Sequence, residues 1–498
     1  MGIVITVIVM LLGILLGAVA GFFSGWVALV LFAPILPLLF LVRDYRVGVV
    51  CLTFVLPWTG SPLLPQAQGF NVVTYLTVAT LLVFVCKSMF GSGKMVRLPR
   101  VFVWCYLLPI SVGIVAAWPH LGEGARNFAM IEAGFSFQPF DFLKAKYVKP
   151  LAFVIYAFLL ANAVRDSVKP ERFLAAFALA AVLPAAAVIV LVGMHGFALS
   201  ELQSQRTFLG PLGLHANDMA LLLLLATGPL LFMWGEVRDG ALKLLCLATL
   251  ALVVAALILT FSRGGYVGLV VVTGTYLYFR KRPGTVAIFV LMAALGVVVA
   301  PQALRDRLST GLESGGVSNT VSGQTNEKLT QGRVASWILL APDVLRSPIW
   351  GRGIGSTAWT SAVAKGAYGA NHPHNMYLEI ALDLGMLGLL SILYLYRSYL
   401  QGFRRLAAAA ELSLLMRRYF AGAGASFLGM LAMSFSAGHY MPYPEQAFLW
   451  FALGALFSYW PLAERAGKIP EGVRVKKGFG MRPPPRIGMS AASKYQLS

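Results

Sequence analysis

The sequence predicts an all-α integral membrane protein with about 14 transmembrane helices and one long loop that carries short helices. Three observations predict this class: 58% of the 498 residues are hydrophobic, only 12% are charged, and the charges stand between long apolar runs. A soluble domain carries roughly 25% charged residues. Lipid favours helices over open sheet, because every backbone hydrogen bond must be made inside the spanning segment.

The predicted spans follow the apolar runs in order. They cover residues 3–22, 24–42, 47–60, 71–90, 101–118, 149–164, 174–194, 215–234, 244–261, 265–279, 285–300, 376–396, 419–437 and 447–460. No Lys or Arg precedes the first run, which is untypical of a signal peptide, so we expect a retained first helix.

The basic residues predict the orientation of these spans. With the amino terminus in the cytoplasm, 27 of the 40 Lys and Arg residues fall in cytoplasmic segments. Seven of the other 13 fall in one long loop, 301–375, and long loops cross a membrane largely regardless of charge. We therefore expect both termini in the cytoplasm, and we expect the loop and the segment 119–148 on the other side.

The net charge of +20 does not indicate a nucleic-acid partner. The basic residues stand in short segments between apolar runs, where membrane lipids are the expected partners. The tail at 461–498 is rich in Pro, Gly and basic residues, so we expect it to be disordered and to contact anionic headgroups. The net positive charge is also compatible with an anionic substrate.

Three arginines stand at the outer ends of predicted spans or in the long loop: Arg206, Arg263 and Arg333. A guanidinium is always charged, and its planar fork matches phosphate oxygens. Converging on one side, the three predict a site for phosphate or diphosphate. The alternative for each arginine is contact with lipid headgroups or a local ion pair.

Two histidines, His372 and His374, open the span that begins at 376. Histidine is the side chain best suited to accept a proton near neutral pH, so His374 is a candidate general base. The alternative is an interfacial histidine without a role. Pro373 predicts a bend that points the two rings in different directions. No cluster of Cys, His and carboxylates completes a coordination shell around them, so no metal is expected.

Glu379 and Asp383 follow four residues apart on one face of this span. Ionisable groups at such depth indicate a functional site, and either carboxylate is the candidate base if His374 is not. The alternative is that both pair with arginines and hold the bundle together. The Gly-rich GRGIGS at 351–356 lacks the strand and spacing of a dinucleotide site, so it predicts a turn.

Around these residues the sequence resembles the O-antigen ligase and polymerase superfamily. The matching motifs are Ser262-Arg263-Gly264, Gly332-Arg333-x-x-x-Trp337, Ser347-Pro348-x-x-Gly351-x-Gly353, and His374-Asn375-x-Tyr377-Leu378 followed by Gly385-x-x-Gly388-Leu389-Leu390. They stand in the family's order over about residues 200–400. Residues 1–200 match only as generic membrane helices, so the resemblance implies a catalytic membrane domain at 201–460.

The resemblance implies a GT-C-like glycosyltransferase of the bacterial inner membrane. It would move a glycan from a polyprenyl-diphosphate carrier to an acceptor hydroxyl at the periplasmic face, by inversion and without metal, nucleotide sugar or other cofactor. By motif position His374 would be the base and Arg263 and Arg333 would hold the diphosphate. Arg206 is carried over from a looser motif. The supporting residues are Asn375, Tyr377, Glu379, Asp383 and His372.

The motifs favour a ligase acting on lipid A–core, with four alternatives. An O-antigen or exopolysaccharide polymerase and a protein O-oligosaccharyltransferase share the same motifs. A transporter or flippase for lipid-linked sugars would show inverted repeats and charges near the membrane midplane. An assembly subunit of an envelope complex would leave the arginines and histidines unexplained.

Overall fold

The computed structural model describes residues 41, 43–62, 64, 66–67, 70–90, 95–131, 138–196, 202, 208–237, 239–280, 284, 333–365 and 372–468. The predicted spans at 3–22 and 285–300, nearly all of 24–42, Arg206, the first part of the long loop and most of the basic tail lie outside these residues.

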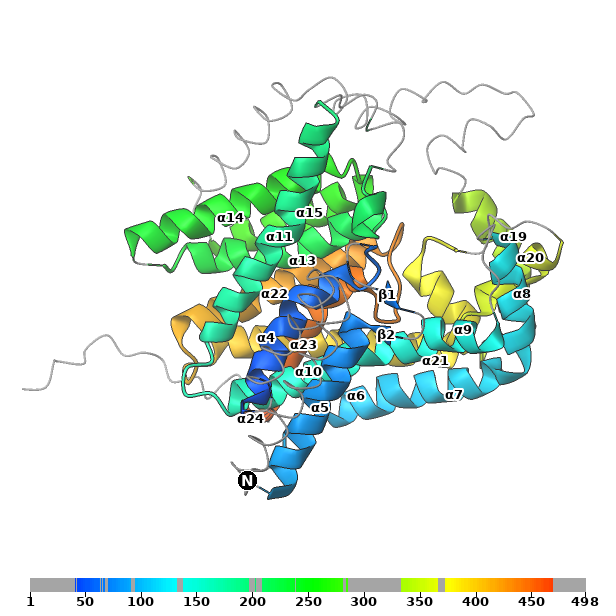
Figure 1. The fold of residues 1–498 in the computed structure, drawn as a ribbon, viewed down its shortest axis with the longest axis horizontal. Coiled ribbons are helices and arrows are strands. Elements are labelled where there is room, and N and C mark those ends of the chain that lie inside the picture. The colour runs from blue at the N-terminus through cyan, green and yellow to red at the C-terminus, as the bar shows by residue number, and fades with distance from the viewer. Residues whose placement is uncertain are drawn as a thin grey trace, which may run out of the picture.

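The described chain is helical, with one two-residue antiparallel ladder, β1 (Gln66–Ala67) and β2 (Phe70–Asn71) (Figure 1). Its longer helices are α4 (Tyr45–Val55), α5 (Val72–Phe90), α7 (Leu108–Ala117), α8 (Leu121–Ile131), α10 (Lys149–Arg165), α11 (Arg172–Met194), α13 (Ala216–Trp234), α14 (Gly240–Leu259), α15 (Arg263–Arg280), α19 (Arg333–Arg346), α21 (Met376–Ala408), α22 (Leu414–Met433), α23 (Ala447–Ser458) and α24 (Trp460–Lys468). The short helices are α6 (Arg100–Phe102), α9 (Pro139–Leu143) and α20 (Ser361–Ala364), and the single turns include η1 (Leu56–Trp58), η2 (Val103–Leu107), η3 (Trp118–His120), η4 (Lys144–Val148), η5 (Gly210–Leu212), η6 (Ser356–Trp359) and η8 (Pro444–Gln446).

Seven of the helical segments are long and apolar enough to cross a membrane, which confirms the multi-pass helical class. They are Val72–Phe90, Arg100–Asn127, Pro139–Arg165, Arg172–Met194, Ala216–Trp234, Gly240–Leu259 and Met376–Ala408.

The helical rods that contain two of the predicted spans, 101–118 and 149–164, extend beyond those spans. One rod continues through Trp118 to Ile131, and the next begins at Pro139. Pro119 does not end the first rod, because it stands in the first turn of η3, where its missing N–H removes no hydrogen bond.

The core of the bundle is α13, which packs against α22, α15 and α14 (Figure 1). At the crossing of α13 and α22 the backbones touch: a Cβ on Gly228 would lie 2.4 Å from the Gly422 carbonyl oxygen. Ser426 Oγ donates to the Leu224 carbonyl (2.7 Å) and accepts from the Gly228 N–H (3.0 Å). Small residues and a hydroxyl thus join two apolar helices, as lipid-embedded interfaces require.

The predicted span at 376–396 is not a continuous helix, because α21 is broken at Gly385 (φ 67°, ψ −169°). The loop before α20 enters the break: the Arg352 and Gly353 N–H groups donate to the Leu382 and Asp383 carbonyls at 2.8 and 2.9 Å, and the Met386 N–H donates to Pro348 (2.8 Å). A Cβ on Gly385 would lie 2.2 Å from the Ile349 carbonyl oxygen. Irregular backbone at membrane depth is tolerated where other protein groups satisfy it, as here.

The turn expected at 351–356 is confirmed. Gly351, Gly353 and Gly355 all have positive φ, from 74° to 89°. A Cβ on Gly351 would lie 2.4 Å from the Asp383 carbonyl, so the glycines of the loop and of α21 permit the same close approach.

Candidate functional site

The loop that leads into α21 carries the predicted base. Trp337 Nε1 of α19 donates to the Pro373 carbonyl (2.7 Å), which fixes the loop against that helix. His374 then has positive φ (48°), which is uncommon for any residue with a Cβ. Asn375 caps α21, because its Oδ1 accepts from the N–H groups of Tyr377 (3.0 Å) and Leu378 (3.1 Å). The motif residues of this loop thus set its backbone.

Three histidines lie together beside this loop. The His372 and His374 ring centroids are 4.2 Å apart, and the His372 ring stacks on His439 at 4.3 Å and 19°. The His439 ring also lies 4.4 Å from that of Tyr443. The prediction that Pro373 separates the first two rings is therefore wrong: the positive φ of His374 brings its ring back toward His372.

Glu379 binds the third histidine. His439 Nδ1 lies 3.0 and 3.1 Å from the two carboxylate oxygens, and both side chains are largely buried. Burial lowers the pKa of His439, but the charge and hydrogen bond of Glu379 outweigh it and raise the pKa to about 10. His439 is thus an imidazolium at neutral pH, and the partner of Glu379 is this histidine and not an arginine, as the alternative interpretation had it.

The other two histidines are neutral at the same pH. Burial, followed by the charges of Arg333, His215 and His439, lowers the pKa of His374 to about 4, although Glu379 opposes the shift. Burial and the neighbouring His439 and His374 lower the pKa of His372 further. A neutral imidazole among cations can accept a proton once an anion enters the site.

Three helices begin at this end of the bundle. His215 caps α13 through Nδ1, which accepts from the Asn217 N–H (3.3 Å). Asn217 Oδ1 accepts in turn from Ser262 Oγ (2.9 Å), just before α15. The first N–H of α21, on Met376, donates to the Ser434 carbonyl (3.0 Å). Helix amino termini carry partial positive charge, so their convergence suits an anion.

Both of the predicted arginines that the structure describes are the first residues of helices. Arg263 is the first residue of α15. A Cβ on the next residue, Gly264, would lie 3.1 Å from Ser436 Oγ. Ser436 stands two residues after Ser434, whose carbonyl accepts the first hydrogen bond of α21. Arg333 is the first residue of α19 and acts electrostatically on both histidines of the loop. Arg263, Arg333 and His374 therefore lie at one end of the bundle. Arg206 lies outside the described residues.

Asp383 lies deeper in α21 and is buried. Its Oδ1 accepts from Ser356 Oγ (2.7 Å) and N–H (3.0 Å), and its Oδ2 accepts from the Gly355 N–H (3.1 Å) and the Tyr440 hydroxyl (2.8 Å). The alternative of an arginine partner thus does not hold for Asp383 either. Its four hydrogen bonds join the break in α21 to the loop and to the segment after α22.

A lysine that the sequence analysis missed reaches the same place. Lys146 Nζ lies 3.2 Å from the Tyr443 hydroxyl and 5.9 Å from the centroid of its ring. The next residue, Tyr147, donates from its hydroxyl to the Ile354 carbonyl (3.0 Å). Both stand on η4, a π-helical turn inside the rod that becomes α10. Such turns are frequent at functional sites.

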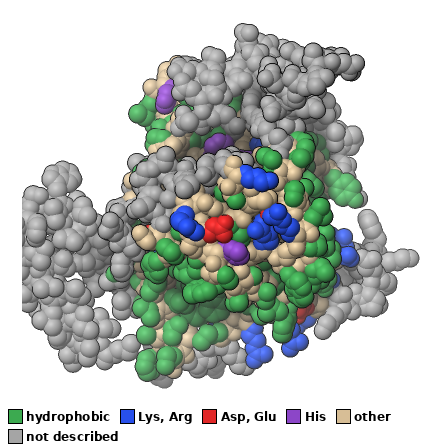
Figure 2. Space-filling model, turned by 90° about the vertical axis from the view of Figure 1, so that its right-hand side faces the viewer, with side chains coloured by type: hydrophobic (Ala, Val, Ile, Leu, Met, Phe, Trp, Pro, Cys, Tyr) green, Lys and Arg blue, Asp and Glu red, His purple; other side chains and the backbone are tan. Residues whose placement is uncertain are grey.

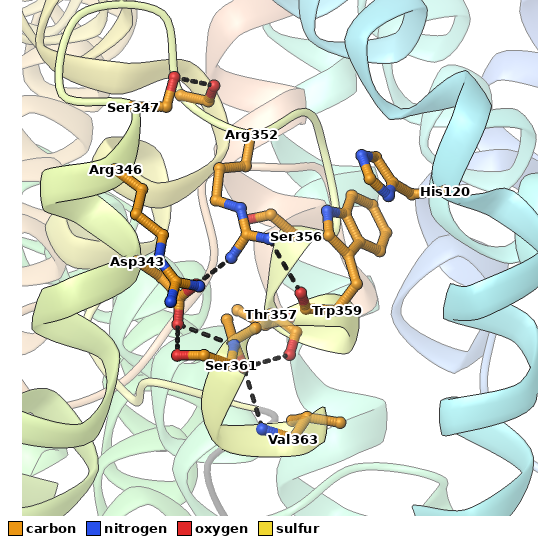
Figure 3. A network of polar contacts seen from close by, with 12 residues as sticks. His120, Asp343, Arg346, Ser347, Arg352, Ser356, Thr357, Trp359, Ser361 and Val363 are labelled. Carbon is orange, nitrogen blue, oxygen red and sulfur yellow. Dashed lines mark hydrogen bonds and ion pairs between the residues drawn. The ribbon is translucent and has the colours of Figure 1, made fainter. Parts of the chain in front are cut away.

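A second polar network holds the loop from outside (Figure 3). Asp343 of α19 is buried and accepts from Arg352, Arg346 (3.3 Å) and Ser361 (N–H 2.9 Å, Oγ 2.7 Å). The other arm of Arg352, Nη2, donates to the Trp359 carbonyl (3.1 Å). The Asp343 carboxylate therefore joins α19 to Arg352, in the loop that enters the break in α21, and to Ser361, at the start of α20.

This network reaches η3, just before α8, through Trp359, whose ring stacks on that of His120 at 5.3 Å and 11°. At this end of the molecule basic side chains surround an acidic group and a histidine, with apolar side chains around them (Figure 2). Arg126, Arg346 and Lys365 are exposed there. The polar tip indicates that this end leaves the apolar layer of the membrane.

The segment between α22 and α23 supplies most of the residues that the sequence analysis missed. Besides His439 and Tyr440 it holds Glu445, which is buried and whose Oε1 has no hydrogen-bond partner among the described residues. Burial and the charge of Asp218 raise the pKa of Glu445 to about 8. The available signal was the density of His, Tyr and Glu in residues 438–446, between two apolar runs.

Within the described ranges no group of three or more His, Cys, Asp and Glu side chains is arranged to hold a metal ion.

Comparison with known proteins places these motifs in one family. Residues 248–393, under a third of the chain, match the family model described as O-Antigen ligase. A search of curated proteins finds no match. The matched part includes the start of α15, the network around Asp343, the histidine loop and the broken half of α21. Residues 248–393 are thus similar to the O-antigen ligase family, in agreement with the resemblance that the motifs carry.

Proposed function

We propose that this protein transfers a glycan from a polyprenyl-diphosphate carrier to an acceptor hydroxyl at the periplasmic face of the bacterial inner membrane. The family is one of ligase- and polymerase-type membrane glycosyltransferases. Within it we propose a ligase with lipid A–core as acceptor, and residues 201–460 as the catalytic domain. The observation that supports this most directly is a neutral histidine, His374, beside a cationic site at converging helix starts.

In the proposed reaction His374 takes the proton of the acceptor hydroxyl. The oxygen attacks the anomeric carbon while the bond from that carbon to the diphosphate breaks, so a single displacement inverts the anomeric centre. Because diphosphate is a good leaving group, the protein mainly has to orient the acceptor and stabilise the charge that develops. No metal or other cofactor takes part in this proposal.

The charge on the leaving diphosphate would be stabilised by Arg263 and Arg333, with Arg206 as a further candidate. The helix starts of α13, α15 and α21 add their partial charges. An anion bound there would also favour protonated His374 over the neutral form, which is the direction that a base needs during turnover.

His439 and Glu379 would act as positioning residues. The imidazolium of His439 stacks on His372, which in turn touches His374. Its charge adds to the cationic site, and Glu379 holds it protonated. Asn375 and Tyr377 would support the loop, and Asp383 would fix the break in α21.

One observation bears on the transporter alternative. Transporters bind substrates at broken helices, and α21 is broken at Gly385. However, the free backbone groups at this break are bound by loop 347–355 and are not left to line a cavity. This favours a rigid catalytic scaffold over a moving gate.

The test is His374→Ala in purified protein with a polyprenyl-diphosphate-linked glycan as donor. Loss of a general base typically costs about 10²–10⁴-fold in rate. We expect this loss in turnover with donor binding nearly unchanged. His195→Ala is the matched control, because His195 is an exposed histidine at the end of α11. Near-normal turnover in His374→Ala, or lost donor binding with unchanged rate, would contradict the assignment and make Glu379 or Asp383 the leading candidate.

The choice of ligase over polymerase is tested in cells by deletion of the gene and electrophoresis of glycolipids. We expect loss of all long glycan on lipid A–core with accumulation of lipid-linked polymer. A product with a single repeat unit on the core would identify a polymerase instead.

A further inference from the structure

A separate cationic cleft lies where α4, α5 and α10 come together. It measures about 400 Å³, and its lining includes Tyr45, Phe84, Lys87, Ser88 and Met95, together with the end of α10. None of these residues belongs to the site described above.

The cleft lies at the opposite end of the bundle from the histidines. The helical rod of α10 passes the site at Tyr147 and reaches the cleft at Arg165. At 1.5 Å per residue this stretch is about 27 Å long. The hydrocarbon core of a bilayer is about 30 Å thick, so the two places face opposite leaflets.

The cations of the cleft are only partly neutralised. Arg165 uses Nε and Nη2 on Asp166 Oδ1 (3.1 and 2.9 Å), which leaves Nη1 for a ligand. Asp166 Oδ2 is already engaged by the Tyr45 hydroxyl (2.9 Å). Lys87 Nζ lies 5.5 Å from the Tyr45 ring centroid, and no described carboxylate lies within ion-pair distance of it. The Lys87 ammonium therefore makes no direct ion pair among the described residues, although Asp44 acts on it at longer range, and it stands beside an arginine arm and the Ser88 hydroxyl.

The rim of the cleft is apolar and exposed. Met95 is 49% exposed, and at the end of α5 Met89 and Phe90 are 74% and 84% exposed. A free phosphate gains nothing from such a rim, whereas the acyl chain of a lipid gains contact area. Basic pockets between transmembrane helices suit anionic headgroups.

We propose that this cleft binds the phosphate of an anionic phospholipid from the adjacent leaflet. Lys87, Arg165 Nη1 and Ser88 contact the phosphate oxygens, and Met95 contacts the acyl chain. The proposal is independent of the glycosyl transfer reaction, so neither stands or falls with the other.

The test is lipid titration of the full-length protein, delipidated in detergent, followed by native mass spectrometry. Phosphatidylglycerol should bind more tightly than phosphatidylcholine. Lys87→Gln should weaken phosphatidylglycerol binding about fivefold, the usual contribution of one basic residue at a membrane surface. Lys169→Gln is the matched control, because Lys169 is exposed beyond the end of α10 and does not line the cleft. Lys87 is itself exposed, and the melting temperature verifies that its variant folds.

A second arm separates a lipid from a free anion. Met95→Asn should weaken phosphatidylglycerol binding, and millimolar inorganic phosphate should not displace the lipid. Equal binding of both lipids, an equal loss in Lys87→Gln and Lys169→Gln, or displacement by inorganic phosphate would each overturn the proposal; the last would leave a site for free phosphate.

Discussion

Replacing Glu379 by Gln tests the electrostatics of the histidine cluster most directly. The carboxylate lies 3.0 Å from His439 Nδ1 and is the main reason that the pKa of His439 is about 10. The amide keeps the shape and removes the charge. Burial, the largest influence on His439, then acts against only the smaller raising effects of Tyr443 and Glu445, so we expect the pKa of His439 to fall below the ordinary value of about 6.5. That is a change of more than about 3 pH units, which corresponds to at least about 4 kcal/mol.

The sign of the effect on stability follows from the same values. The pKa of His439 in the folded protein is above that of free histidine. The pair therefore stabilises the fold fully below about pH 6.5, and this contribution is lost as the pH rises toward 10. In Glu379→Gln the dependence reverses, because a buried neutral histidine must become charged as the pH falls. The variant should lose stability below about pH 6.

The assay is pH titration of ¹⁵N-labelled histidine by NMR in detergent, since the chain has only six histidines. Glu123→Gln is the matched control: Glu123 pairs with His120 at 3.5 Å, but both side chains are 41% exposed, so solvent screens this pair and its removal should leave His439 unchanged. The reasoning is refuted if His439 titrates near neutral pH in the wild type or still above about pH 8 in Glu379→Gln.

Three further outcomes test the scaffold and the chemistry. Gly385→Ala should destabilise the protein by on the order of 3 kcal/mol in thermal unfolding, because its Cβ would meet the Ile349 carbonyl at positive φ. Gly274→Ala is the control and should be neutral, because open space surrounds Gly274. Equal effects of the two changes would contradict the fit of the loop into α21. Arg263→Lys should lower the transfer rate nearly as much as Arg263→Ala, because lysine lacks the bidentate fork, and full activity in the lysine variant would reduce Arg263 to a generic charge. Activity on purified substrate should survive a chelator; loss that a divalent ion restores would show that a metal takes part.

The sequence predicted the elements of the site better than their contacts. The histidine loop before the span at 376 and the turn at 351–356 follow from local signals such as glycine spacing and the start of an apolar run. The ring arrangement of His372 and His374 was predicted wrongly, because Pro373 indicates a bend but not the positive φ of the residue after it.

The partners of the two carboxylates could not be predicted from the sequence. Pairing with arginine was the alternative considered, because a guanidinium matches a carboxylate well. In the structure Glu379 binds His439, and Asp383 binds hydroxyls and backbone N–H groups. Local spacing on α21 gives the depth of these carboxylates but says nothing of which segment packs opposite them.

The sequence by itself determined that this is a multi-pass helical membrane protein whose residues 248–393 are similar to the O-antigen ligase family, because hydropathy and short motifs are properties of contiguous residues. The tertiary structure alone decided which side chains meet. Glu379 and His439 are 60 positions apart, and Asp383 and Tyr440 are 57 apart. Each pair forms because α21 breaks at Gly385, accepts the loop before it and packs against α22, and a pattern read along one segment cannot specify such a crossing.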